Sequence, residues 1–199
     1  MTISKTMIFN MALNELGVTA PIANANAQDD TRAIILRNFY ETARDEVLKS
    51  FDWNFAETYR QLTPTVFECL HPSYDFVYDY PNDCLSAREV FEQRATDVRR
   101  KFKISSDSTG QKVILTTVQP IILRYTRRVE QEAFFTPEFA ITLAMYLAAL
   151  AGKAITGSGE KASDAMKRYW DKVRLAQMSN AAEGQEVDED KNTYLDIRG

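Results

Sequence analysis

The sequence is poor in the residues that enzymes most often use for catalysis. Among 199 residues it has one histidine and two cysteines. His71 stands beside Pro72 with no nucleophile motif around it, so we expect neither a catalytic triad nor a cysteine–histidine pair. Cys69, His71 and Cys84 would supply three zinc ligands, but a structural zinc site needs four. We therefore predict free thiols, a surface histidine, and no cofactor or metal.

Glycine is also scarce, and none of the seven glycines begins a phosphate-binding P-loop, because none is followed by Lys-Ser or Lys-Thr at the required spacing. The stretch from Gly157 to Ala162 matches the G-x-G-x-x-A pattern of dinucleotide-binding folds. That fingerprint requires a strand before the first glycine, whereas a helical pattern precedes it here. We interpret the stretch as a turn between two helices.

The sequence has no apolar run of the roughly 20 residues that a membrane-spanning helix needs. The longest run, residues 139–151, has Thr142 as its only polar side chain. Thr136 offers an N-cap hydroxyl, and Pro137 suits the first helical position. Because the run is apolar on all sides, we predict a central, buried bundle helix over 136–156 rather than a membrane span.

Three further segments carry apolar residues at helical spacing. They cover residues 4–16, residues 29–50 and the stretch that follows Gly159. In the second segment Tyr40 falls on the predicted buried side and Arg44 on the polar side. The chain turns acidic from about residue 181 and regains apolar residues only near its end, which predicts an exposed tail. The N-terminus shows no secretion signal, so we expect a cytoplasmic start.

Between the second and third helices the chain consists of short segments rich in β-branched and aromatic residues, separated by turn-forming residues. The predicted strands are 57–62, 76–80, 87–92, 98–105, 112–116 and 121–128. The clearest pair is 98–105 with 112–116, joined by the turn-forming SDSTG at 106–110. This pattern predicts an antiparallel hairpin.

Together these segments predict a mainly α fold with a β insertion (α+β). A bundle of about four helices, over 4–51 and 136–183, would be interrupted by a small antiparallel β domain over 56–132. Residues 1–183 would form a single domain, and 184–199 a flexible acidic C-terminal tail.

The net charge of −4 is unevenly distributed. Residues 94–128 hold nine basic and two acidic residues, a balance of +7, which leaves −11 elsewhere. Basic residues interleaved with Phe102 and Tyr125 would suit a nucleic-acid surface. The same alternation also fits a one-sided sheet whose charged edge resists aggregation, and on composition alone we favour the sheet.

Two carboxylate pairs, Glu41 with Asp45 and Glu130 with Glu132, offer an enzymatic alternative. A glycosidase uses two carboxyl groups about 5 to 10 Å apart. Such pairs are also typical of a solvated helix face or strand end, which we favour. We therefore expect no enzyme, with a glycan hydrolase as the alternative.

Four segments, taken in order, resemble the head-to-tail adaptor family of short-tailed bacteriophages, which includes tail tubular protein A and head-completion proteins. They are ALNELGV at 12–18, SFDWNFA at 50–56, YDYPNDCL at 78–85 and the run from 120 to 158 that begins PIILRYTRRVEQEAFF. The resemblance covers about residues 5–180.

The resemblance implies a structural protein of the virion, assembled in the host cytoplasm and placed at the head–tail junction. About twelve copies would form a ring between the portal protein and the tail nozzle or tube, and viral DNA would pass through the lumen without sequence-specific binding. The C-terminal tail would reach the portal, with Tyr194, Leu195 and Ile197 as anchors. No membrane is implied.

A channel through which DNA slides should not be strongly basic, because each neutralised phosphate adds affinity. We therefore expect the clustered basic residues mostly at protein interfaces. The predicted basic interface patch consists of Arg99, Arg100, Lys101, Lys103, Arg124, Arg127 and Arg128. As an alternative, a plain nucleic-acid-binding module would bind duplexes through Arg99, Arg100 and Lys101.

Overall fold

The computed structural model describes residues 2–65, 69, 71–93 and 95–183. Helix α1 (Lys5–Glu15) begins after Ser4, and α2 (Thr31–Ser50) begins after Asp30. The side chains of these two residues accept backbone N–H groups from the first turn of each helix, at 3.3 Å and 2.9 Å. These caps confirm the predicted starts of both helices.

Helix α3 (Pro137–Thr156) begins after its N-cap Thr136 and ends at Gly157, which has a left-handed backbone (φ 72°). Helix α4 (Gly159–Glu183) follows at once. The interhelical turn is therefore confined to Gly157 and Ser158, and the rest of the stretch predicted as a turn, Gly159 to Ala162, is helical. Two single-turn 3-10 helices, η1 (Asn54–Ala56) and η2 (Glu132–Phe134), lie in the connections to and from the strands.

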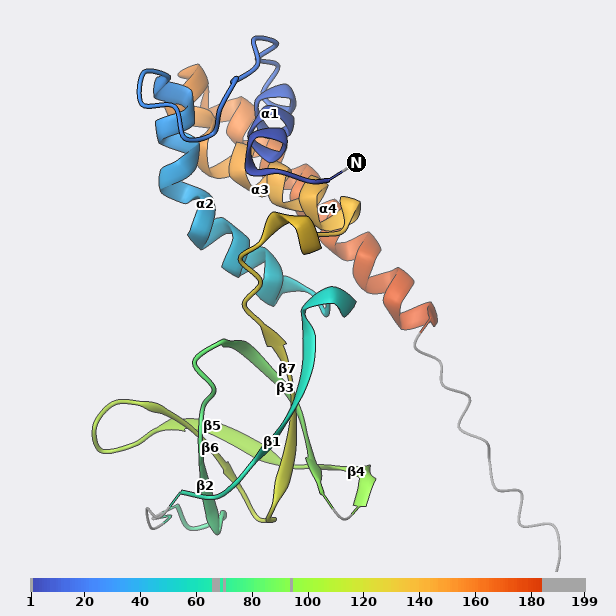
Figure 1. Ribbon diagram of the computed structural model, residues 1–199. Coiled ribbons are helices and arrows are strands. Elements are labelled where there is room, and N and C mark those ends of the chain that lie inside the picture. The colour runs from blue at the N-terminus through green and yellow to red at the C-terminus, as the bar shows by residue number, and fades with distance from the viewer. Residues whose placement is uncertain (1, 66–68, 70, 94, 184–199) are drawn as a thin grey trace, which may run out of the picture.

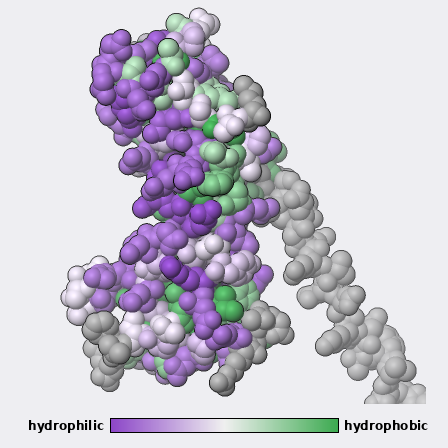
Figure 2. Space-filling view, viewed as in Figure 1, coloured by the Kyte–Doolittle hydropathy of each residue, from purple (hydrophilic) through white to green (hydrophobic). Residues whose placement is uncertain are grey.

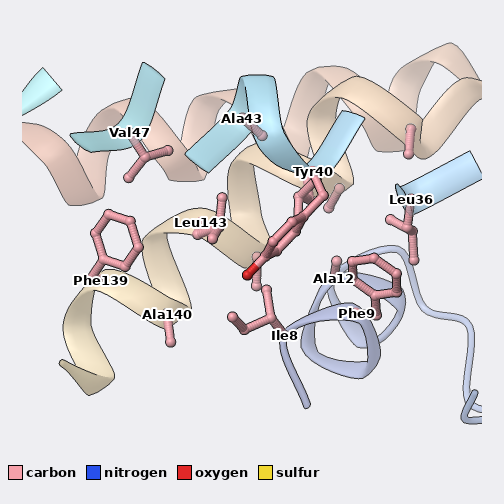
Figure 3. Packing of buried hydrophobic residues seen from close by; sticks show 14 of the residues in the cluster. Ile8, Phe9, Ala12, Leu36, Tyr40, Ala43, Val47, Phe139, Ala140 and Leu143 are labelled. Carbon is pink, nitrogen blue, oxygen red and sulfur yellow. The ribbon is translucent and has the colours of Figure 1, made fainter. Parts of the chain in front are cut away.

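The four helices share one apolar core (Figure 3). Tyr40 extends from α2 toward Ile8 of α1 and Leu143 of α3, and its ring packs edge-on against Phe9 with centroids 5.6 Å apart. Nearer the strands, Trp53 packs edge-on against Phe139 of α3 at 5.2 Å. Such aromatic pairs contribute about 0.5–1.5 kcal/mol beyond the area they bury.

Helix α3 is central but is not buried on all sides, which corrects the prediction. It packs against α1, α2 and α4. By length and composition it could cross a membrane, yet 50% of that stretch is buried inside the protein. Met145 and Ala149, one turn apart, are only partly buried. One side of the most apolar helix therefore remains partly open.

Within the described residues, seven strands form two antiparallel sheets, with orders β1-β7-β3-β4 and β2-β6-β5. The strands are β1 (Glu57–Leu62), β2 (Phe76–Asp79), β3 (Cys84–Glu92), β4 (Ala95–Arg100), β5 (Phe102–Ser106), β6 (Lys112–Thr116) and β7 (Ile121–Arg127). The β5–β6 hairpin confirms the predicted pair. The single strand predicted at 98–105 is wrong, because the chain leaves one sheet and enters the other at Lys101. The carbonyl of Lys101 accepts the Thr116 hydroxyl at 3.0 Å.

The expectation of a mainly α fold with a β insertion is also wrong. Helices make up 45% and strands 23% of the structure, so the fold is a mixed α/β one with a small β domain. The physical reason is that the strands bury cores of their own. Val90, Ile114 and Leu123 are fully buried in the larger of these, which is separate from the helical core.

Figure 1 shows the helical part and the β part stacked end to end, joined by the segments between α2 and β1 and between β7 and α3. Helix α4 extends beyond the other helices. Figure 2 shows hydrophilic residues across the zone where the two parts meet, with hydrophobic residues gathered on either side of it. On this face the boundary between the two parts is therefore polar.

Candidate functional site

The helical part and the β part meet at a charged junction built on Arg124 of β7. Its Nη1 and Nη2 donate to Asp52 Oδ2 at 2.6 and 2.7 Å. Its Nε lies 3.4 Å from Glu57 Oε2 and 3.6 Å from Glu89 Oε2. Burial, which leaves the side chain 18% exposed, disfavours the charged form, but the three carboxylates outweigh it and raise the pKa of Arg124. Arg124 therefore ties the end of α2 to β1 and β3.

A second arginine, Arg88 of β3, binds the end of α2 directly. Its Nη2 donates to the carbonyls of Lys49 and Phe51 at 3.1 and 3.0 Å, and its Nε donates to Thr126 Oγ1 at 2.9 Å. The last carbonyls of a helix lack partners within it, and a positive charge there also complements the helix dipole. Sequence reasoning missed Arg88, because nothing near it in the sequence marks it as the partner of a distant helix end.

Asp45 of α2 makes a further link across the junction. It pairs with Arg44 Nη2 and with Arg128 Nε, each at 2.9 Å. Arg44 is only 7% exposed, so its predicted place on the solvent face is wrong, because the side chain lines a pocket between α2 and the segment after β7. The Arg128 N–H also donates to the carbonyl of Asp83 at 2.7 Å. The carboxylate of Asp83 accepts the Tyr125 hydroxyl at 3.1 Å, and burial together with that carboxylate raises the pKa of Tyr125 to about 12.

The structure does not gather the predicted basic interface patch on one surface. Arg124 and Arg128 lie in the junction, where carboxylates hold them. Arg127 lies at the end of β7 and lines a shallow cavity of about 440 Å³, with no ion pair to any residue of the described ranges.

The other four members of the patch lie on or beside strands β4 and β5. Arg99 pairs with Glu89 at 3.1 Å, although its side chain is 74% exposed. Arg100 Nη2 pairs with Glu92 Oε2 at 2.7 Å. Lys101 is exposed between the strands, and Lys103 Nζ lies 3.2 Å from His71 Nε2. Arg99, Lys101 and Lys103 are exposed here.

The predicted anchors Tyr194, Leu195 and Ile197 lie outside the described residues. The helix that leads to them does expose apolar side chains, since Trp170 is 54% and Leu175 63% exposed. A groove of about 280 Å³ beside Trp170 is lined by aromatic and polar residues of α2, α3 and α4. The helical spacing of apolar residues after Gly159, which includes Trp170, predicts burial of this side chain, and the structure shows that this prediction is wrong.

Both carboxylate pairs from the sequence line one polar pocket of about 490 Å³ between α2 and the segment after β7. Its residues are Lys5, Tyr40, Glu41, Thr42, Arg44, Asp45, Arg128, Glu130 and Glu132. Glu132 accepts the Tyr40 hydroxyl at 2.9 Å, and burial followed by this carboxylate raises the pKa of Tyr40. Glu41 and Glu130 make no ion pair or hydrogen bond through their side chains within the described ranges. Of the four acidic residues of this pocket, these two remain free to act on a ligand.

The residues considered for zinc do not form a cluster. Cys69 and His71 line a cavity of about 460 Å³ beside β5 and β6, whereas Cys84 is buried in β3. Burial raises the pKa of the Cys84 thiol to about 11, so it is a poor nucleophile at neutral pH. Within the part of the chain that the structure describes, no three His, Cys, Asp or Glu residues are placed to hold a metal.

Together these contacts hold the helical part and the β part in one arrangement. Exposed apolar side chains lie on α4, and exposed basic side chains lie on or beside β4 and β5. Comparison with protein-family models finds no match, and no curated protein matches the chain.

Proposed function

We propose that this chain is a structural virion protein, the subunit of an adaptor ring between the portal and the tail of a short-tailed bacteriophage. One observation carries the proposal. Three of the four segments that bear the resemblance, 50–56, 78–85 and the start of 120–158, come together at the charged junction. Arg124 binds Asp52 across 72 positions of the chain, and Tyr125 binds Asp83 across 42.

A ring subunit must keep one shape, because small angular errors accumulate around a closed ring. The junction supplies such rigidity, since it links α2 to β1, β3 and β7 through several ion pairs and helix-end hydrogen bonds. The exposed Trp170 and Leu175 on α4 give the chain an apolar surface at the helix that precedes the tail. These features suit a subunit with separate contacts for its copies and for its partners.

The first experiment is the mass in solution, by light scattering, of the purified chain alone and then with the portal protein of the same genome. We expect a complex that adds about twelve copies to the portal. An alanine variant of Tyr194, Leu195 and Ile197 should lose this association. Alanine at Glu186, Asp188 and Asp190 is the matched control and should keep it. No association of the intact chain with the portal would overturn the proposal.

A glycan hydrolase is the second candidate, because both carboxylate pairs line a single polar pocket. In this reading Glu41 and Glu130 are the acid and base, since Asp45 and Glu132 are held by other side chains. Turnover of peptidoglycan or capsule that Glu41→Gln or Glu130→Gln removes, with an unchanged melting temperature, would favour it. Asp164→Asn, an exposed carboxylate on α4, is the control that should keep the activity.

A further inference from the structure

The four-stranded sheet has two open edges on opposite sides. Its order is β1-β7-β3-β4, and within the described ranges no strand pairs with the outer side of β1 or of β4. Figure 1 shows β4 as a short strand set apart at one side of the β part. All three pairings in the sheet are antiparallel. With four strands, β1 and β4 therefore run in opposite directions.

Charges of alternating sign cross one face of this sheet. The register places Glu89 opposite Arg124. Glu57 lies two residues from Tyr59, which is opposite Arg124, and Arg99 is opposite Phe91, two residues from Glu89, so these charges share one face. The contacts are 3.4 Å from Glu57 to Arg124, 3.6 Å from Arg124 to Glu89, and 3.1 Å from Glu89 to Arg99. The row thus begins with a carboxylate on β1 and ends with a guanidinium on β4.

The two edges of the sheet are therefore complementary to each other. Arg99 is largely exposed and has a single carboxylate partner in the described chain, so it can accept another. Glu57 stands at the opposite edge. A second copy in the same orientation would bring its β1 beside β4 of the first, and the alternation of charge would continue without a break.

We propose that neighbouring copies of this chain associate by joining β4 of one copy to β1 of the next, so that the four-stranded sheets continue from subunit to subunit. This inference rests on the proposed ring and identifies its lateral contact. Because β1 and β4 run in opposite directions, copies that point the same way pair antiparallel strands. The contact is heterologous, as a closed ring requires.

Side-chain alternation fixes which residues meet across the contact. Successive residues of a strand point to opposite faces, so the face that bears Glu57 must align with the face that bears Arg99. Placing Glu57 opposite Arg99 also places Thr58 opposite Val98, whose side chain is 41% exposed. A slip by one residue would bring Glu57 to the wrong face. The backbone hydrogen bonds supply adhesion, and the charges select the register.

Disulfide trapping tests the contact in the full chain. In a Cys69→Ser background, which leaves only the buried Cys84, the Thr58→Cys/Val98→Cys double variant is oxidised alone and with the portal protein. We expect a ladder of linked species beyond the dimer. The two single variants are matched controls and should remain unlinked. If no linked species form, either alone or with the portal protein, the contact is overturned. If a single variant gives as many dimers as the double variant, the contact is instead a two-fold pairing of like edges, β1 with β1 or β4 with β4.

Charge reversal gives an independent test. Arg99→Glu places like charges at every contact, and so does Glu57→Lys, so each variant alone should lose the oligomer. In an equimolar mixture the two variants can alternate around an even-numbered ring. The position-99 side chain of each copy then meets an opposite charge at position 57 of the next copy, at every contact. We expect the mixture to recover most of the wild-type oligomer by light scattering. Circular dichroism of each variant shows whether it is folded, and failure of two folded variants to assemble when mixed overturns the proposal.

The two proposals fail separately. A complex with the portal that forms without the ladder of disulfide-linked species would keep the adaptor and reject this edge contact. A ladder without portal association would keep the edge contact and reject the adaptor.

Discussion

Replacing Arg124 with methionine tests whether the charged junction holds the two parts together. Methionine keeps much of the length of the side chain and removes the guanidinium that binds Asp52, Glu57 and Glu89. The three carboxylates then face one another with fewer cations between them. Arg88 remains 3.8 Å from Asp52, so the loss of compensation is partial.

The magnitude follows from the burial of the pair. Breaking a fully buried ion pair costs about 3–5 kcal/mol, whereas exposed pairs contribute about 0–1 kcal/mol. The Arg124 and Asp52 side chains are 18% and 25% exposed, which places this pair between the two cases. We expect the free energy of unfolding to fall by about 2–3 kcal/mol. For a domain of this size the melting temperature should fall by roughly 5 to 10 °C.

The measurement is urea denaturation followed by both circular dichroism and tryptophan fluorescence. Both tryptophans, Trp53 and Trp170, lie in the helical part, so fluorescence reports on that part and circular dichroism on the whole chain. Arg127→Met on the same strand is the control and should change stability by less than about 0.5 kcal/mol. Equal stabilities for the two variants would refute the structural role of the junction. Separation of the two transitions would show that the junction couples the two cores.

Three further substitutions test local features. Asp30→Ala should remove about 1 kcal/mol by loss of the α2 N-cap, whereas Asp29→Ala should not. Hydrogen bonding to Arg32 lowers the pKa of Asp30, so denaturation at a series of pH values should show this stability above about pH 4 and its loss at lower pH. Gly152→Ala places a Cβ 2.9 Å from a leucine methyl of the helix α1 C-cap and 3.1 Å from the α4 backbone, so thermal melting should show a net loss of about 1 kcal/mol, whereas Gly159→Ala meets nothing within 4 Å and should show none. Burial raises the pKa of Cys84 from 9.0 to about 11, so the stability that its neutral thiol contributes is present below pH 9 and is lost toward pH 11. In alkaline denaturation, the free energy of unfolding of Cys84→Ala should therefore fall by about 2 kcal/mol less than that of the wild type between these pH values.

The helices could be predicted because the residues that begin and end them are adjacent to them in the sequence. Ser4, Asp30 and Thr136 each accept a backbone N–H at the first turn, and Gly157 ends α3 with a left-handed backbone. The division of 98–105 into two strands could not be predicted, because the alternation of basic and apolar residues continues through Lys101. Only pairing with β3 on one side and with β6 on the other separates β4 from β5.

The carboxylate partners of the basic residues could not be predicted from the sequence either. Arg124 and Arg128 form part of a basic cluster along the chain, but their carboxylate partners are 72 and 83 positions away. The sequence places Arg44 on a solvated face because the segment after β7, which lines the same pocket, is distant along the chain. The adaptor assignment, the tail anchors and the lateral contact stay predictions.

The placement of the basic residues bears on how DNA would pass such a ring. Among the seven residues of the basic interface patch, Arg99, Arg100, Arg124 and Arg128 have carboxylate partners. A phosphate would have to displace those carboxylates, which lowers its affinity for these four sites. Three cations per copy, Lys101, Lys103 and Arg127, have no carboxylate partner in the described ranges. Duplex binding through this patch should therefore be weak, with a salt dependence that corresponds to about three phosphates or fewer. Weak contact of this kind suits a lumen through which DNA slides.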